Sequence, residues 1–128
     1  MVRLNIAMLK RGLSVGTQEL LTVSGRKSGE PRQTPVSISQ VDGQRYIVAA
    51  IADANWVSNV RAAKIGTLGH GSNNETVSLT ELPVGERGPV LRAFLEQVRR
   101  GRRFFGSKTP DEVVEGAASY PVFRVDSA

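Results

Sequence analysis

Residues 33–51 constrain the fold most, because they combine two strand-like segments with a tight turn. Gln33 to Gln40 alternates, with Val36 and Ile38 on one face and serines on the other, which is the period of a β-strand. An Asp-Gly pair, typical of a two-residue hairpin, follows in Val41-Asp42-Gly43-Gln44. Arg45 to Ile51 is apolar on both faces and is predicted to be a central, buried strand. The stretch therefore predicts an antiparallel hairpin.

The rest of the chain alternates between short strand-like and helix-like segments. Further strands are predicted at Glu19 to Ser24, 65–68, 75–82 and Tyr120 to Val125. Helical spacing predicts helices at Leu4 to Leu13, 56–63, 90–98 and 109–116. Asp53 or Asn55 is expected to cap the start of the second helix, and Gly66 is expected to end it. Thr109 is expected to cap the last helix. This order predicts an α+β fold built on a small antiparallel barrel, with helices packed outside it.

Length, composition and charge narrow the class of protein. The 128 residues predict a single domain, 1–128, with residues 1–16 as an N-terminal helical segment. Seventeen Lys and Arg against 12 Asp and Glu give a net charge of +5, which favours anionic partners. The chain has no cysteine, and its single histidine, His70, has no partners for a metal site. No apolar stretch approaches the roughly 20 residues of a membrane span, and no signal peptide is recognisable, so a cytoplasmic location is expected.

The loop Ser24-Gly25-Arg26-Lys27-Ser28-Gly29-Glu30-Pro31-Arg32 follows the first predicted strand and carries three cations. It is not a nucleotide-binding P-loop, because Arg26 stands where that motif needs glycine and a strand follows instead of a helix. Its glycines allow close backbone approach, and its cations and hydroxyl suit an anion. Composition alone favours a solvated turn and leaves the anion site as the alternative.

Two other stretches also allow more than one interpretation. The run Arg99-Arg100-Gly101-Arg102-Arg103 with Phe104-Phe105 could bind nucleic acid, but charges at a helix end are usually solvated, and paired phenylalanines usually belong to a core. Trp56 and Asn59 share one helix face. The pattern alone favours a core tryptophan beside an exposed amide.

Two longer motifs together resemble a known family. Leu21 to Pro35, which reads LTVSGRKSGEPRQTP, and Asn55 to Ala63, which reads NWVSNVRAA, resemble the deazaflavin-dependent nitroreductase family of actinobacteria. The Asp42-Gly43 hairpin and the apolar Val48-Ala49-Ala50 stand between them in the family's order. The resemblance covers residues 16–82, with a weaker match in the helix beyond.

The resemblance implies both a fold and a cofactor. The fold is a split β-barrel like that of the FMN-binding pyridoxamine oxidase relatives. The cofactor is the reduced 8-hydroxy-5-deazaflavin coenzyme F-420, with FMN a weaker candidate, and its tail carries a phosphate and several glutamates. The implied activity is hydride transfer from this coenzyme to an electron-poor small molecule such as a quinone, an enone or a nitro compound.

The resemblance also assigns roles to individual residues. Arg26, Lys27, Ser28 and Arg32 would hold the phosphate and carboxylates; Thr34, Pro35 and Val36 would line the deazaflavin ring; Ala49 and Ala50 would contact it through the backbone; and Trp56 and Asn59 would close the cofactor groove. Tyr120 is the candidate for a substrate contact, no residue is assigned to acid or base catalysis, and no metal is implied.

Two other classes of function remain alternatives at this point. One is a non-catalytic binder of a flavin-like cofactor or of lipid, and the other is a basic nucleic-acid-binding module. The favoured partners are the coenzyme and a small acceptor, without nucleic acid. The expected assembly is a monomer or a homodimer, with membrane contact through the N-terminal segment only as a weak addition.

Overall fold

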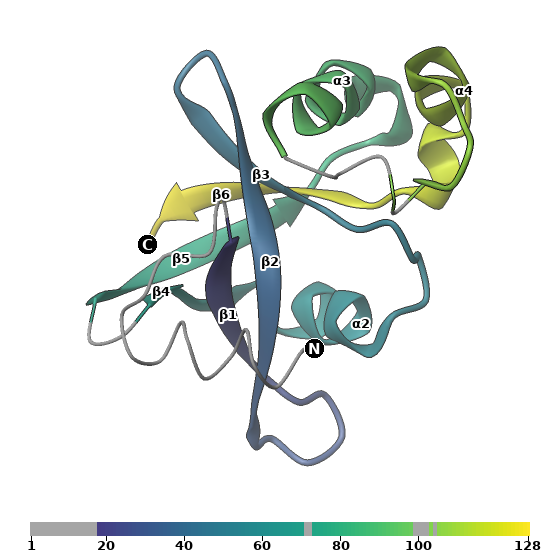
Figure 1. Ribbon diagram of the computed structural model, residues 1–128. Coiled ribbons are helices and arrows are strands. Elements are labelled where there is room, and N and C mark those ends of the chain that lie inside the picture. Colours follow the sequence, from purple (N-terminus) through teal and green to yellow (C-terminus); the bar gives the residue numbers. More distant parts are fainter. Residues whose placement is uncertain (1–17, 71–72, 99–102, 104) are drawn as a thin grey trace.

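The computed structural model describes residues 18–70, 73–98, 103 and 105–128. Its six strands form a closed barrel in the order β1-β2-β3-β6-β5-β4, and all neighbouring strands are antiparallel (Figure 1). This confirms the predicted antiparallel barrel of an α+β fold. The strands are β1 Gln18–Ser24, β2 Pro31–Val41, β3 Gln44–Val48, β4 Ile65–His70, β5 Asn73–Glu81 and β6 Val122–Ser127.

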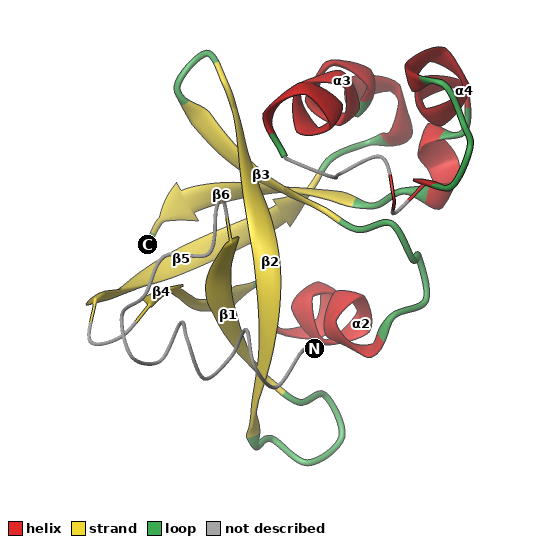
Figure 2. Ribbon diagram, in the orientation of Figure 1, coloured by secondary structure: helices red, strands yellow, loops and turns green. Residues whose placement is uncertain are grey.

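The helices lie outside the barrel in two places, as Figure 2 shows in red. The helix α2 (Asn55–Ala63) lies near the end of the barrel where the β1–β2 loop projects, whereas α3 (Gly88–Gln97) and α4 (Pro110–Glu115) lie together beside the β2–β3 hairpin. Two short 3₁₀ turns, η1 (Val84–Glu86) and η3 (Ala117–Ser119), flank α3 and α4. The predicted helix at Leu4 to Leu13 lies outside the described residues.

The predicted hairpin at residues 33–51 is present, but its second strand is shorter than expected. Asp42 and Gly43 both have positive φ, 51° and 78°, as a two-residue turn of this twist requires. β3 ends at Val48, and Ile51 is 64% exposed, so the prediction of a buried strand up to Ile51 was wrong. The physical reason is that the chain must turn here to enter α2, and Ala54 donates a backbone hydrogen bond to Ile51 in that turn.

Alternate residues of the six strands fill the barrel. The valines Val57 and Val60 of α2 are buried in the same cluster, so this helix is fixed directly to the barrel core. The strand members of the cluster are Leu21, Val23, Val36, Ile38, Ile47, Leu68, Val77, Leu79, Phe123 and Val125. A second cluster lies under α3 and α4 and includes Val48, Leu91, Phe94, Phe105 and Val122.

Both predicted ends of α2 need correction. Neither Asp53 nor Asn55 caps the helix; the N-cap is Ala54, with no side-chain cap. The helix ends at Ala63 and not at Gly66, and its C-cap is Lys64, whose φ of 61° is left-handed. Gly66 lies within β4, where an added Cβ would stand 2.6 Å from the Thr22 carbonyl oxygen of β1. This glycine therefore allows close packing of two strands and does not end a helix.

The outer face of β2 is partly covered by α3. Gln97 donates a hydrogen bond to the Gln40 carbonyl (2.6 Å) and accepts one from the Gln40 backbone N–H (2.7 Å). Ser39, which the alternation placed on the polar face of the strand, is fully buried, and its hydroxyl has no hydrogen-bond partner among the residues that the structure describes. Strand periodicity identified the two faces of β2 correctly, but it did not show that a helix covers the second one.

Candidate functional site

A groove of about 1200 Å³ lies between the β1–β2 loop and the first turns of α2. Both walls come from the two motifs that carried the sequence resemblance. Its lining residues are Gly25, Arg26, Lys27, Ser28, Glu30, Pro31, Arg32, Gln33, Thr34, Asn55, Trp56 and Asn59.

The loop that forms the first wall has an ordered backbone. The Gly25 N–H donates to the Glu30 carbonyl and the Gly29 N–H donates to the Gly25 carbonyl, each at 2.8 Å. Gly29 has a φ of +75°, which favours glycine. A Cβ on Gly25 would stand 3.2–3.3 Å from the Ser28 hydroxyl and the Arg32 side chain, so glycine lets these side chains close over the loop.

Lys27 and Arg32 bring uncompensated positive charge to this wall. Both are exposed, and within the described part of the chain neither has a carboxylate within ion-pair distance. Arg32 makes only a long contact, 3.5 Å, from its guanidinium to the Ser28 hydroxyl. Ser28 also accepts the Glu30 N–H at 3.2 Å. Two cations and one hydroxyl thus lie together at the solvent-exposed surface, where an anion could bind to them.

Arg26 differs from the other two cations because its side chain is turned to α2. Its guanidinium donates to Asn59 Oδ1 at 2.8 Å, and its backbone N–H donates to the same oxygen at 3.1 Å. Longer contacts of 3.4 and 3.5 Å reach the carbonyl and side-chain oxygens of Asn55. Arg26 therefore joins the two walls of the groove.

Trp56 forms the apolar part of the second wall. It is half-buried and packs on the barrel core. The centroids of the Trp56 and Phe123 rings are 6.1 Å apart, and the ring planes are inclined at 56°. Trp56 is thus both a core residue and a groove residue, because part of it packs on the barrel core and part of it lines the groove. Asn59, expected to be exposed, is only 6% exposed.

The structure brings most of the predicted site residues together, but not all of them. Arg26, Lys27, Ser28, Arg32, Thr34, Trp56 and Asn59 line the groove, whereas Pro35, Val36, Ala49 and Ala50 are not among its lining residues. The side chains of Val36 and Ala49 belong to the barrel core. Contacts from these two residues to a ligand are therefore expected from the main chain.

Tyr120 lies elsewhere in the molecule. It is 7% exposed and packs edge-on against Phe105, with ring centroids 4.7 Å apart, in the cluster under α3 and α4. It is not among the residues that line the groove. Its burial explains its presence structurally, and its predicted contact with a substrate finds no support in the groove.

Sequence reasoning missed several groove residues, of which Asn55 matters most. Asn55 was considered only as a helix cap, yet it lines the groove and is contacted by Arg26. Its position four residues before Asn59 was the available signal, because residues at this spacing share a helix face. The other lining residues outside the predicted set are Gly25, Glu30, Pro31 and Gln33.

The residues present fit a cofactor that has a flat ring and an acidic tail. Lys27 and Arg32 supply unpaired positive charge for phosphate and carboxylates, and Trp56 supplies an apolar wall for a ring. A closed antiparallel barrel with this outer groove is suited to binding a flavin-like cofactor.

Comparison with known proteins identifies the family. A family model described as F420H(2)-dependent quinone reductase matches residues 1–109, most of the chain. The chain therefore belongs to this family: it is a reductase that uses the reduced deazaflavin coenzyme, as the two sequence motifs had indicated. A search of curated proteins found no match.

Solved structures share the fold at low sequence identity. One, described as a domain-swapped dimer, has a TM-score of 0.64 and 20% identity over 97% of this chain and 95% of that one. A second, described as an F420-H2 dependent reductase, has a TM-score of 0.59 and 22% identity over 86% and 94%. A third, described as an FAD-binding protein from Mesorhizobium loti, has a TM-score of 0.56 and 15% identity over 100% and 91%. These likenesses support the barrel fold.

Proposed function

We propose that the groove between residues 25–34 and α2 holds the reduced coenzyme, and that the protein passes its hydride to a quinone-type acceptor. The observation that carries the proposal is that Lys27 and Arg32, which have no ion-pair partner among the described residues, lie in the same groove as Trp56. The family match supports the coenzyme and the class of acceptor. Enones and nitro compounds are proposed as further acceptors.

Within this proposal the protein binds and orients, and the cofactor supplies the hydride. Lys27, Ser28 and Arg32 hold the phosphate and glutamates of the tail, while Thr34 and Trp56 border the ring. Charge-assisted hydrogen bonds contribute about 1.5–3 kcal/mol each, so three near the upper end of this range would hold an acidic tail at micromolar concentration. Glu30 is the only carboxylate among the lining residues, and no proton transfer is assigned to it.

Titration against three ligands tests this function. The deazaflavin coenzyme, FMN and a DNA oligomer would each be added at two salt concentrations. We expect the coenzyme to bind much more tightly than FMN, and more tightly as its glutamate number rises, because FMN has one phosphate and no glutamates. Higher salt should weaken coenzyme binding, because exposed charges are screened. Reduction of a soluble quinone by the loaded protein completes the test.

Other results would support the alternatives. Equal affinity for the coenzyme and FMN would contradict the role of the loop in tail binding. Submicromolar affinity for DNA without coenzyme binding would favour the nucleic-acid module.

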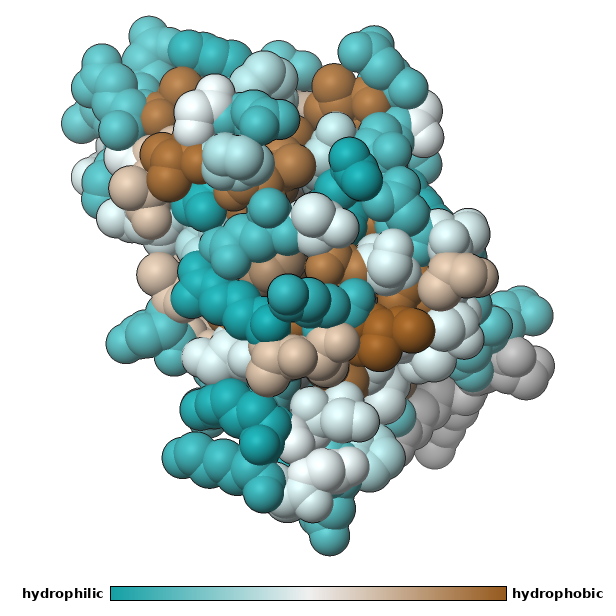
Figure 3. All heavy atoms as spheres, turned by 180° about the vertical axis from the view of Figure 1, so that it is seen from behind, coloured by the Kyte–Doolittle hydropathy of each residue, from teal (hydrophilic) through white to brown (hydrophobic). Residues whose placement is uncertain are grey.

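The described surface does not favour the alternative of a lipid binder. No helix in the described ranges is long and apolar enough to cross a bilayer. On the face shown in Figure 3, hydrophobic side chains form separate areas between hydrophilic ones. The exposed large hydrophobic residues, Ile51, Ile65 and Val84, belong to three different segments of the chain.

A further inference from the structure

We infer that Arg26 and Asn59 form a clamp that positions the basic loop, and that Arg26 does not itself bind the coenzyme tail. This inference rests on the proposed function of the groove. It changes the role that the sequence resemblance gave to Arg26 and Asn59, from ligand contacts to positioning residues. The direct contacts then fall to Lys27, Ser28 and Arg32.

The first argument is the geometry of the acceptor. Asn59 Oδ1 accepts two hydrogen bonds from one residue, at 2.8 Å from the Arg26 guanidinium and at 3.1 Å from its backbone N–H. Asn59 is only 6% exposed, so water competes poorly for its Oδ1 atom. The pair therefore fixes both the side chain and the main chain of Arg26.

The second argument is the connection of the loop to the rest of the molecule. The hydrogen bonds inside the loop join Gly25 to Gly29 and Glu30, and so hold its shape but not its position. In the described structure, the side-chain hydrogen bonds from residues 25–30 to another helix or sheet element outside this hairpin all come from Arg26 and end on α2. Without them, the described contacts would hold the loop only at its base, where Ser24 of β1 pairs with Pro31 of β2.

The third argument is the contrast between the three cations. Arg26 has its acceptors within the protein. Among the described residues, by contrast, Lys27 has no hydrogen-bond or ion-pair partner, and Arg32 has only the 3.5 Å contact to Ser28. An anion that bound Arg26 would have to share its guanidinium with Asn59. An anion that bound Lys27 or Arg32 would displace no ion pair of the described chain.

The clamp can be tested first without any ligand, by hydrogen exchange at the backbone amides of Gly25 and Gly29. We would compare wild type with Arg26→Ala, Asn59→Ala and the matched control Lys27→Ala. The clamp predicts that the first two variants speed exchange in the loop at least several-fold and leave the barrel strands unchanged. Lys27→Ala should exchange like wild type. Equal exchange in all four proteins would overturn the clamp.

The second test is coenzyme affinity at several salt concentrations, with a double-mutant cycle. Asn59→Ala should weaken binding about tenfold although it removes no charge, on the order of one lost charge-assisted contact. Arg26→Ala should also weaken binding, but its affinity should depend on salt as that of wild type does. Adding Arg26→Ala to the Asn59→Ala variant should weaken binding by less than about a further twofold. Lys27→Ala should weaken binding and flatten the salt dependence, because it removes a direct ionic contact.

Different outcomes separate this inference from the proposed function. If Arg26→Ala flattens the salt dependence as Lys27→Ala does, Arg26 is a direct ligand and the inference is wrong. If Asn59→Ala binds the coenzyme as well as wild type, the clamp is wrong. If Lys27→Ala and wild type bind the coenzyme equally, the proposed tail site is wrong, whatever the exchange experiment shows. Thermal melting of each variant checks that it is folded.

Discussion

Lys27 and Arg32 lie on the same wall of the groove but present their charge differently. Lys27 is an exposed, flexible point charge, whereas Arg32 lies over Gly25 and contacts the Ser28 hydroxyl. A guanidinium can hold a carboxylate or phosphate through two parallel hydrogen bonds, which an ammonium cannot do. At the scale of single residues, the two side chains should therefore contribute unequally to binding.

We predict that Lys27→Ala weakens coenzyme binding by roughly ten- to a hundredfold, the equivalent of one charge-assisted contact. Arg32→Ala should have the larger effect. The turnover rate at saturating coenzyme should barely change in either variant, because these cations hold the tail and not the ring. Steady-state kinetics with a quinone acceptor and the melting temperature provide the measurements. Unchanged affinity in both variants would mean that the loop is only a solvated turn.

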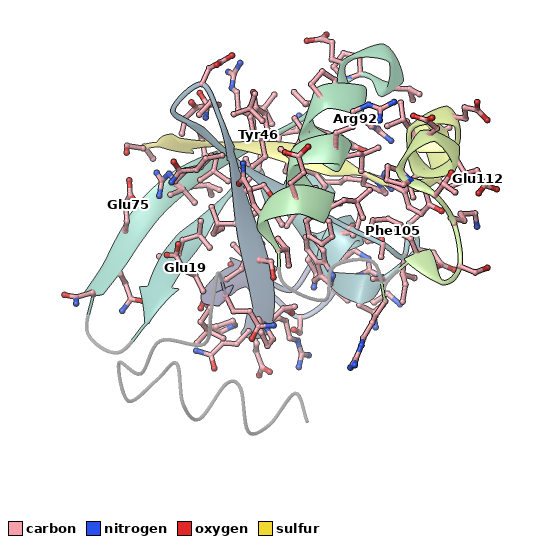
Figure 4. All side chains as sticks on the ribbon, turned by 45° about the horizontal axis from the view of Figure 1, so that its top comes forward. Glu19, Tyr46, Glu75, Arg92, Phe105 and Glu112 are labelled. Carbon is pink, nitrogen blue, oxygen red and sulfur yellow. The ribbon has the colours of Figure 1, made fainter. Side chains whose placement is uncertain are left out.

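Among the elements, α4 shows how far local sequence can determine structure. The helix has six residues, too few to be stable alone, yet its start was predicted from Thr109 and Pro110. The structure adds a full capping box, in which Thr109 Oγ1 accepts the Glu112 N–H at 3.2 Å and Glu112 Oε1 accepts the Thr109 N–H at 3.0 Å. Figure 4 shows Glu112 on α4 and Phe105 in the neighbouring segment.

We predict that Thr109→Ala lowers the free energy of unfolding by about 1 kcal/mol, the usual cost of a lost N-cap. Thr109→Ser is the matched control and should be nearly neutral, because it keeps the hydroxyl. Chemical denaturation measures both. Coenzyme affinity should be the same in both variants, because Thr109 is not a lining residue of the groove. A loss of affinity in Thr109→Ala alone would contradict the separation of α4 from the site.

In the whole molecule, Glu81 connects α2 to the cluster under α3 and α4. It makes a two-pronged ion pair with Arg61 of α2, at 2.8 and 2.9 Å, and a third contact of 3.1 Å with Arg87. Arg87 is only 6% exposed, and it also donates to the carbonyls of Leu82 and Ala117. One carboxylate thus joins the end of β5, the groove helix and a buried guanidinium.

This connection should make stability depend on pH. The hydrogen bonds from Arg61, with the nearby charges of Arg61 and Arg87, hold the pKa of Glu81 below its ordinary value. A carboxyl whose pKa is lower in the folded than in the unfolded state stabilises the fold above its ordinary pKa, and this contribution is lost as the pH falls through the folded pKa. The contribution of Glu81 is therefore complete at neutral pH and fades in acid, below about 4.5.

We predict that Glu81→Gln lowers the free energy of unfolding at pH 7 by about 1–3 kcal/mol, because Arg87 then keeps its burial but loses its carboxylate. The difference between variant and wild type should shrink as the pH falls toward 3. Arg61→Gln is the control, and it should cost at most about 1 kcal/mol because Arg61 is exposed. Denaturant unfolding across this pH range provides the measurement. A constant difference at all pH values would rule out the titration of Glu81 as its cause.

Features that depend on neighbouring residues could be predicted from the sequence. The Asp42-Gly43 turn, the alternation of Val36 and Ile38 and the Thr109 cap are local, because each depends on backbone preferences or contacts within a few positions. The motifs from Leu21 to Pro35 and from Asn55 to Ala63 indicated the family and its coenzyme differently, through their resemblance to known sequences.

Features that depend on residues far apart in the chain could be recognised only in the folded structure. Arg26 meets Asn59 across 33 positions, and no local pattern shows that a cation expected to bind an anion already has an acceptor. Ser39 is buried because α3 covers it, and Gly66 is a glycine because β1 comes too close for a Cβ. Closure of the barrel and helix packing create these contacts. The sequence could therefore predict several residues that line the groove, such as Lys27 and Trp56, but not which of its cations remain available to a ligand.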